Sequence, residues 1–271
     1  MITPPESVAP VRGRTPWEVQ RAVLFALLLR ESKARVGGQW VGAVWTLFEP
    51  LAHTLIFLTI LVALRGRAVP GVEVAVWLAV GLLPFFLFQN LATRLMDGID
   101  ANRGLFSYRQ VKPLDTLVSR ATVETLMNLL VYAFTLGILG WLGFHTLPVR
   151  PLEAMGVHVV IIVLGTAFGI LAAVISHERA RLRSFIRMTM MPLYFASGVI
   201  IPLDLVPPDM LAWLLLNPLA HLLDLSRQAF LPGHVPLPGV DASYPAFFAL
   251  VLLALALSAY RADRLRLVTS T

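Results

Sequence analysis

The chain has 271 residues, of which 57% are hydrophobic and only 14% are charged, and its mean hydropathy is +0.75. Soluble domains seldom hold so much apolar sequence, so the composition predicts an all-α integral membrane protein. Because the sequence has no cysteine, disulfide frameworks and thiolate metal sites are excluded. Residues 1–15 lack the apolar core that a secretory signal needs, and we expect them to form a flexible cytosolic tail.

The first predicted element is an amphipathic helix over 16–36 that lies in the plane of the membrane surface. Thr15, Pro16 and Glu18 provide an N-cap, a proline at the first helical position and a capping-box acid. The apolar run over 22–29 is too short to cross a bilayer and has basic residues on both sides. An interfacial helix suits this pattern better than a transmembrane helix does.

Six longer apolar segments follow, and most of them approach the roughly 20 residues that a helix needs to cross the hydrocarbon core. We expect a second cytosolic tail, over 263–271, after the last of them. The six predicted spans are 40–64, 74–96, 116–143, 154–176, 184–201 and 243–260.

The most polar interruption of the apolar sequence lies between the second and third spans. Asp97 and Asp100 stand where an N-cap and a third helical residue would be, and Gly104 can end a helix in the left-handed conformation. These residues predict a helix of roughly nine residues, which is too short to be stable alone. Leu105 and Phe106 are expected to be exposed, so the element needs a surface on which to dock.

Two apolar stretches between the fifth and sixth spans are too short to cross the membrane. They cover 210–216 and 219–230, and Asn217 and Pro218 separate them. Bent backbone at membrane depth is tolerated only where protein or water covers it. We therefore expect two short re-entrant helices on the periplasmic side, within 202–230.

Lysine and arginine are unevenly distributed across this predicted topology. With both termini cytoplasmic, all 22 of them fall on the cytosolic side except Arg65, Arg67, Arg150 and Arg227. This asymmetry favours that orientation. The net charge of +6 is then a topology signal, and we expect no nucleic-acid partner. The basic cluster over 179–187 is either part of this signal or a contact for anionic lipid headgroups.

Catalytic motifs are missing from the sequence. It holds no P-loop, HExxH, GxSxG or CxxC pattern. We therefore expect neither nucleotide hydrolysis by this chain nor a cofactor of its own. Its six histidines are scattered along the sequence, which predicts no metal site.

The first span carries a polar face within apolar sequence. Trp45, Glu49 and His53 recur every four residues and so share one side of a helix, while Pro50 frees a backbone carbonyl beside them. Ionisable residues in a span usually face a bundle interior or a wet cavity. This face either contacts sugars, since tryptophan stacks on pyranose rings and glutamate accepts hydroxyl protons, or it fixes helix pairing, with Glu49 bonded to His53.

Cations near the cytosolic boundary also have two interpretations. Arg30, Lys33 and Arg35 either attract lipid headgroups or capture a lipid-linked anion as it enters. Arg94, in the second span, is either an anchor that reaches the interface or a ligand for substrate. Glu124, early in the third span, is expected to pair with another helix.

Taken in order, several motifs resemble those of the permease of type 2 ABC exporters. The N-terminal part reads RES-K-R, then G-x-x-W-x-x-x-EPL-x-H, and the C-terminal part reads G-x-x-IP, NPL and D-x-x-R. Within that family, EPLAH, RAVPGVEV and GLFSYRQVKPLDT look most like the capsular polysaccharide export permease of Gram-negative bacteria. The matching residues are Arg30, Glu31, Lys33, Arg35, Gly42, Trp45, Glu49, Pro50, Leu51, His53, Gly198, Ile201, Pro202, Pro207, Asn217, Pro218, Leu219, Asp224 and Arg227.

The resemblance implies a multi-pass half-transporter of the bacterial inner membrane, over 16–262, that works as a homodimer. It implies that Mg-ATP is hydrolysed on a separate ABC ATPase subunit. A periplasmic adaptor and an outer-membrane polysaccharide channel would complete the path. The substrate would be a lipid-linked acidic capsular polysaccharide whose anchor carries Kdo residues.

The resemblance also implies three groups of functional residues. A coupling helix over 97–106 would dock in a cleft of the ATPase and move the second and third spans, while the first and fifth spans line a channel at the dimer interface. The coupling residues are Asp97, Asp100, Asn102, Arg103, Leu105, Phe106, Tyr108 and Arg109. The substrate or lipid-anchor contacts are Arg30, Lys33, Arg35, Trp45, Glu49, His53 and Arg94. The periplasmic gate residues are Gly198, Pro202, Asn217, Pro218, Asp224 and Arg227.

Three alternatives remain open at this point. The chain could be the permease of an O-antigen or teichoic-acid exporter, or a type 2 exporter of drugs or lipids. It could also be a membrane enzyme acting on lipid-linked sugars, with Glu49 and His53 as acid and base.

Overall fold

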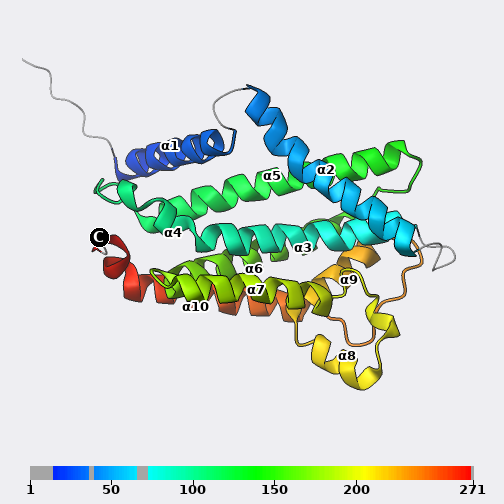
Figure 1. Ribbon diagram of the computed structural model, residues 1–271. Helices are drawn as coiled ribbons and strands as arrows, with labels where there is room; N and C mark the ends of the chain where they lie inside the picture. The colour runs from blue at the N-terminus through cyan, green and yellow to red at the C-terminus, as the bar shows by residue number, and fades with distance from the viewer. Residues whose placement is uncertain (1–14, 37–39, 66–72, 270–271) are drawn as a thin grey trace, which may run out of the picture.

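The computed structural model describes residues 15–36, 40–65 and 73–269, and Figure 1 shows their arrangement. These residues form ten α-helices and two short 3-10 turns, without a strand among them. The predicted all-α fold is confirmed. Residues 1–14 of the predicted N-terminal tail, the predicted outward cation Arg67 and the last two residues lie outside the described ranges.

The helices differ widely in length and in apolar character. Only α3, α5, α6 and α10 are, within the described ranges, long and apolar enough to cross a membrane. The count of six spans therefore stays a prediction. The elements are α1 (Pro16–Val36), α2 (Trp40–Arg65), α3 (Val74–Met96), α4 (Gly98–Ala101), η1 (Arg103–Leu105), α5 (Pro113–Trp141), α6 (Pro151–Ser176), α7 (Ala180–Ala196), η2 (Leu203–Leu205), α8 (Pro208–Leu214), α9 (Pro218–Phe230) and α10 (Ser243–Thr269).

Two helix ends differ from the predicted bounds for physical reasons. Helix α7 stops at Ala196 because the chain turns there, with Gly198 at a φ of +72°. Helix α10 continues to Thr269, through most of the predicted C-terminal tail. Its last turns hold because Tyr260 and Leu267 are buried in the core.

Helix α3 lies at the centre of the bundle, and α5, α6 and α9 pack around it. Most of its residues are apolar and buried, as expected of a helix at the centre of a bundle. Gly165 and Gly169 of α6 let the two backbones approach, because a Cβ at Gly169 would lie 2.8 Å from the carbonyl oxygen of Leu91. This close packing fixes α3 to α6.

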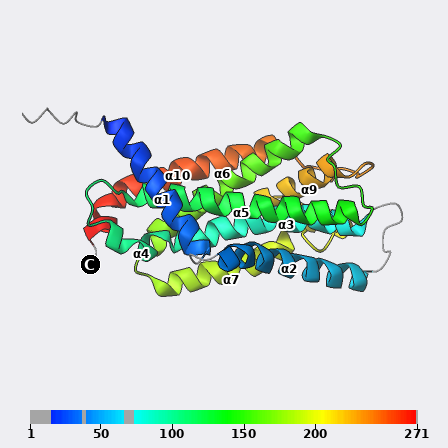
Figure 2. The same ribbon diagram turned by 90° about the horizontal axis from the view of Figure 1, so that it is seen from above.

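Helix α1 begins as predicted. The backbone N–H of Thr15 donates to Glu18 Oε2 (2.9 Å), and the backbone N–H of Glu18 donates to Thr15 Oγ1 (3.3 Å). This pair is a capping box, so that prediction is confirmed. Helix α1 then lies across the outside of α5 (Figures 1 and 2).

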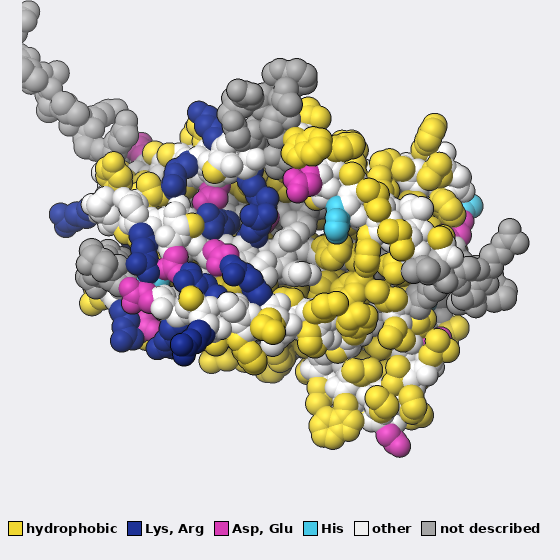
Figure 3. Space-filling model, viewed as in Figure 1, with side chains coloured by type: hydrophobic (Ala, Val, Ile, Leu, Met, Phe, Trp, Pro, Cys, Tyr) yellow, Lys and Arg dark blue, Asp and Glu magenta, His cyan; other side chains and the backbone are white. Residues whose placement is uncertain are grey.

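The bundle has two chemically different ends. One, which we call the α4 end, holds α4 and the end of α10; the other, the α9 end, holds α8 and α9 (Figure 1). Figure 3 shows basic and acidic side chains gathered at the α4 end, whereas hydrophobic side chains cover most of the rest of this face. The same face carries α2 and α7, which lie along one edge of the bundle in Figure 2.

Candidate functional site

The polar loop after α3, which we call the α4 segment (residues 97–109), forms two short turns instead of one helix. The side chain of Asp97 caps neither of them, and Gly104 lies inside η1 without a positive φ. The predicted nine-residue helix and its glycine end are therefore wrong. The physical reason is that the carboxylates of Asp97 and Asp100 bind arginines of α7, so they do not accept hydrogen bonds from the backbone N–H groups of the α4 segment.

The apolar pair of this segment is not exposed as predicted. Phe106 is 8% exposed and belongs to the main core, and Leu105 is half-buried against the same core. Phe106 is thus unavailable as an anchor for another protein. Of the predicted coupling residues, Arg103, Tyr108 and Arg109 are exposed.

Two ion pairs join the α4 segment to the start of α7. Arg187 Nη2 donates to Asp97 Oδ1 at 2.7 Å, and Arg183 donates to Asp100. Asp100 also lies 3.0 Å from Nδ1 of the buried His177. The cluster over 179–187 therefore has internal partners that the sequence did not reveal. The only sequence signal was the presence of two acids and two arginines, each pair at helical spacing.

A second polar network joins the α4 segment to α1 and α5. Arg30 donates to the side-chain oxygen of Asn102. Asn102 is buried, and its side-chain N–H donates to the carbonyl of Gly98 (2.8 Å). Glu31 lies 3.4 Å from Asn102 and forms an ion pair with Arg120 at 3.2 Å. Asn102 therefore holds the α4 segment to α1, and a partner cannot reach it. Residues Glu31 and Arg120 had no predicted role.

A polar cavity of about 460 Å³ lies between α2, α3 and α5 and receives side chains from the end of α1. It brings together four of the predicted substrate contacts, Arg35, Glu49, His53 and Arg94. Trp45 does not line it and is 59% exposed on the outer side of α2. Arg30 and Lys33 do not line it either, and the sequence analysis missed Gln89, Asn90 and Asn128, which do.

The charges in this cavity are partly matched. Glu124, which is 3% exposed, forms an ion pair with Arg35, and Arg94 Nε lies 3.9 Å from it. The predicted pairing of Glu124 with another helix is confirmed. Glu49 makes no hydrogen bond or ion pair with the described part of the chain, and His53 stacks on a neighbouring phenylalanine. The alternative that Glu49 bonds His53 is therefore not what the structure shows.

At the α9 end, Arg227 is a buried cation, not a surface charge. It is 2% exposed, and its guanidinium lies 3.5 Å from the ring centroid of Trp77. Its Nη2 donates to the carbonyls of Gly198 (2.8 Å) and Val199 (3.1 Å). Gly81 of α3 makes room for it, because a Cβ there would lie 2.5 Å from Nη2. Arg227 thus joins α9 to α3 and to the turn after α7.

Asn217 and Asp224 hold the rest of this region in place. Asn217 caps α9 by accepting from the backbone N–H of Leu219 (3.0 Å), and its amide donates to Ser197 Oγ (2.8 Å). Asp224 is buried, which opposes ionisation, but His234 hydrogen-bonds to it and Gln228 donates a second bond. These contacts hold the pKa of Asp224 below its ordinary value.

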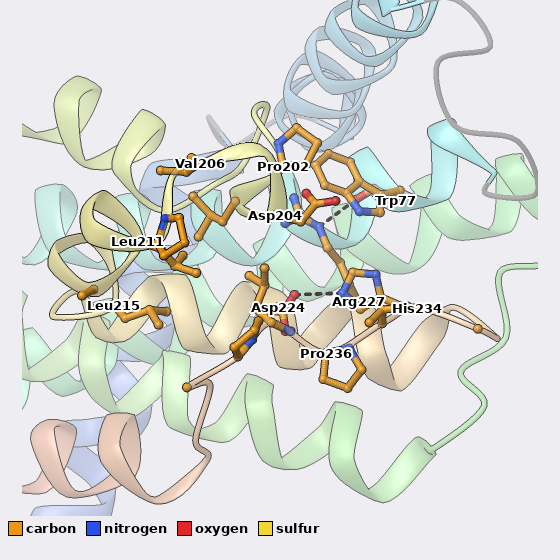
Figure 4. A pocket seen from close by; sticks show the side chains of 18 of the residues that line it. Trp77, Pro202, Asp204, Val206, Leu211, Leu215, Asp224, Arg227, His234 and Pro236 are labelled. Atoms are coloured by element: carbon orange, nitrogen blue, oxygen red, sulfur yellow. Dashed lines mark hydrogen bonds and ion pairs between the residues drawn. The ribbon is translucent and has the colours of Figure 1, made fainter.

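A second cavity, of about 880 Å³, lies beside these residues. Apolar side chains from η2, α8 and the loop 233–239 form most of its wall (Figure 4). Trp77, Asp224 and Arg227 enter from the bundle side, and Pro202 closes one edge. Two of the predicted gate residues, Asn217 and Gly198, brace the cavity without lining it, and Pro218 provides the first residue of α9.

Comparison with known proteins matches residues 22–231 to the family model described as "ABC-2 type transporter". The chain belongs to the ABC-2 type transporter family. It is 36% identical over 258 residues to the polysialic acid transport protein KpsM of Escherichia coli, covering 95% of this chain and 100% of that protein. The resemblance to the type 2 ABC exporter permease is therefore confirmed.

Two further relatives of this ABC-2 permease align with about four fifths of the chain. The capsule polysaccharide export inner-membrane protein CtrC of Neisseria meningitidis serogroup A is 27% identical over 221 residues, which is 78% of this chain and 80% of CtrC. The O-antigen export system permease protein RfbA of Myxococcus xanthus is 25% identical over 219 residues, covering 80% and 83%.

Proposed function

We propose that this ABC-2 permease exports a lipid-linked acidic capsular polysaccharide across the bacterial inner membrane, driven by ATP hydrolysis on a separate ATPase subunit. The observation that carries the proposal is the nearly full-length identity of 36% to a polysialic acid transport protein. A second relative is named for the export of capsule polysaccharide. Polysialic acid is an acidic polymer, and the arginines of the polar cavity suit an anionic substrate.

In this proposal α2 and α7 cross the membrane together with the four longer apolar helices. Helix α7 starts at the α4 end, where Arg183 binds Asp100, and reaches the α9 end, where Gly198 binds Arg227. Its 17 residues cover about 25 Å, close to the thickness of the hydrocarbon core. Six spans place both termini on one side, and the basic residues at the α4 end support a cytoplasmic location for that side (Figure 3).

The ATPase docks on the α4 segment through its exposed side chains, Arg103, Tyr108 and Arg109. Arg103 also lies 2.9 Å from Asp100 and 3.5 Å from Glu178, so the docking surface is continuous with the ion pairs to α7. Binding at this surface transmits force directly to the polar network. Mg-ATP is held by the ATPase and not by this chain.

A second copy of the chain completes the transport path. Helices α2 and α7 share one edge of the bundle (Figure 2), and each of them has exposed apolar side chains. Phe48, Ile56 and Ile60 of α2, with Phe185 and Met191 of α7, supply the dimer face. The polar cavity opens beside it, where Arg35 and Arg94 receive the anionic end of the lipid-linked chain. A periplasmic adaptor and an outer-membrane channel then take the polymer from the α9 end.

Affinity purification of this chain, co-expressed with its neighbouring genes, tests the proposal. We expect an ABC ATPase to be recovered with it. Arg103→Glu combined with Tyr108→Asp should abolish this recovery while membrane insertion stays normal. The matched control is Arg150→Glu, an exposed arginine on the other side of the membrane, which should have no effect. Unchanged recovery and unchanged export in the double variant would refute the docking surface.

Export of O-antigen is the second candidate, because RfbA aligns over 83% of its own length. Mass spectrometry of lipids that co-purify with the chain separates the two. The capsule route predicts a Kdo-bearing lipid anchor. Recovery of a lipid anchor without Kdo would favour the O-antigen route.

A further inference from the structure

We propose that α7 carries movement from the α4 segment to the gate helix α9, with Arg183 and Arg187 as positioning residues at one end and Asn217 and Arg227 at the other. This inference rests on the proposed function, since an ATPase must move the α4 segment. It differs from the expectation that the spans on either side of that segment, α3 and α5, move first.

Helix α3 is poorly suited to move by itself. Most of its side chains are buried, and its backbone is in close contact with α6 at Gly165 and Gly169. Cβ atoms at these glycines would lie 3.0 Å or less from Leu91 or Leu95, so there is no space to tilt one helix against the other. A push on the α4 segment therefore has to act on a less tightly packed neighbour.

Helix α7 is that neighbour. Ile186 and Met190 are its only buried residues, and Tyr194 makes an edge contact with Phe85 of α3. The opposite side of α7, including Phe185 and other large apolar residues, is exposed in the single chain and faces the second copy in the proposed dimer, so it does not hold α7 to the rest of its own bundle. A helix with so narrow a packed stripe can tilt at a smaller cost than one that is buried on all sides.

The α4 end of α7 is attached through charges at helical spacing. Arg183 and Arg187 lie four residues apart and so face the same way, toward Asp100 and Asp97 respectively. The arginine–aspartate pair at Asp97 is 50% and 38% exposed, so it can break and form again at a cost of about 0–1 kcal/mol. The exposed Arg103 touches Asp100 as well, which places the pairs directly behind the docking surface.

The α9 end of α7 is attached through hydrogen bonds to the turn that follows it. Asn217 donates to Ser197 Oγ at 2.8 Å, and Arg227 donates to the carbonyls of Gly198 and Val199. Both donors belong to α9 or its cap. Any displacement of the end of α7 therefore displaces α9 and the wall of the 880 Å³ cavity beside it.

Charge-swap variants, with the distance between two spin labels as the readout, test whether movement follows this path. The chain has no cysteine, so spin labels can be placed at Leu205→Cys in η2 and Trp141→Cys at the end of α5, both of which are exposed. The complex with its ATPase is reconstituted in lipid nanodiscs, and the label distance is measured by pulsed electron paramagnetic resonance with and without ATP. Export and ATP hydrolysis are measured on the same unlabelled variants.

We expect ATP to shift the distance in the parent chain. Asp97→Arg and Arg187→Asp should each abolish the shift and reduce export per ATP hydrolysed about tenfold, while hydrolysis continues. The double swap should restore both the distance shift and the export per ATP hydrolysed. Such a recovery would not occur if the single variants had simply failed to fold. Arg150→Asp breaks an exposed ion pair of the same kind, with Glu153, and should change neither readout.

A shift that survives Asp97→Arg, or a double swap that restores nothing although it purifies and binds the ATPase normally, would overturn the inference. The absence of ATPase binding or of any ATP response in the parent chain would instead contradict the proposed function. The two failures are therefore distinguishable.

Discussion

The two ends of α7 are held by different kinds of interaction. At the α4 end, Arg187 and Asp97 form a half-exposed ion pair, which contributes about 0–1 kcal/mol. At the α9 end, Arg227 is 2% exposed and bonds two carbonyls while it covers an indole ring. Buried charge-assisted bonds of this kind are expensive to leave unmade. The Arg187–Asp97 pair can therefore open and close during a transport cycle, whereas the contacts of Arg227 belong to the fold.

This difference could not be read from residue type, since arginine supplies both attachments. What separates them is access to water and the chemistry of the acceptor. A carboxylate on a flexible side chain can exchange partners, whereas backbone carbonyls at a fixed turn cannot. The following predictions test that contrast, beginning with the largest expected effect.

Loss of the buried arginine should be the most damaging change. Arg227→Ala leaves the carbonyls of Gly198 and Val199 without their donor and opens a cavity beside Trp77, so we expect a loss of about 3–5 kcal/mol. Arg227→Lys should recover little, because an ammonium cannot stack on the indole and bond both carbonyls. Thermal unfolding in detergent, followed by tryptophan fluorescence, measures the stability of both variants. Recovery by lysine would contradict a role for the planar group.

A smaller loss is expected from crowding the same arginine. Gly81→Ala places a Cβ 2.5 Å from Arg227 Nη2, and overpacking of this kind costs about 1–3 kcal/mol. Gly104→Ala is the matched control at the α4 end, where a Cβ would meet nothing within 4 Å. Equal melting temperatures for the two variants would show that Arg227 is less tightly held than we describe.

The acid sensitivity of the α9 end should depend on Asp224. Its pKa is held below the ordinary value, so its contribution to stability is complete above the unfolded-state pKa, about 3.9, and is lost as the pH falls through the folded value. Asp224→Asn should lower the melting temperature at neutral pH and flatten its decline in acid. An unchanged pH profile in the variant would remove Asp224 from this account.

The smallest effect on stability is expected at the α4 end. Arg187→Gln should lower the free energy of unfolding by no more than about 1 kcal/mol, although export should fall sharply. Raising the salt concentration should reduce the difference in stability between the parent chain and the variant, because salt screens a half-exposed pair. A large, salt-independent loss of stability would mean that this pair is structural, like Arg227.

Local signals made part of the fold predictable from the sequence. The capping box at Thr15 and Glu18 involves residues three apart, and apolar length alone indicated the long helices. The pairing of Glu124 was also predictable, because a buried acid in an apolar span needs a partner wherever that partner comes from.

The long-range contacts could not be predicted in this way. Asp97 resembles an N-cap by its position, but an arginine 90 residues away in the sequence competes successfully for it. Phe106 looks exposed within a polar loop, yet the loop folds back onto the core and buries it. Arg227 looks like an outward charge until Gly81 of a distant helix is seen to make space for it. Each case depends on which helices meet, and local sequence does not contain that information.

The most direct test of the central claim is transport by purified components. Proteoliposomes that hold this chain and its ATPase are given a lipid-linked acidic polysaccharide, and the appearance of polymer in the opposite compartment is followed over time. We predict movement that requires ATP and both proteins and that falls about tenfold per ATP hydrolysed in Asp97→Arg. Turnover or chemical modification of the lipid-linked sugar by this chain alone, without an ATPase, would contradict the account.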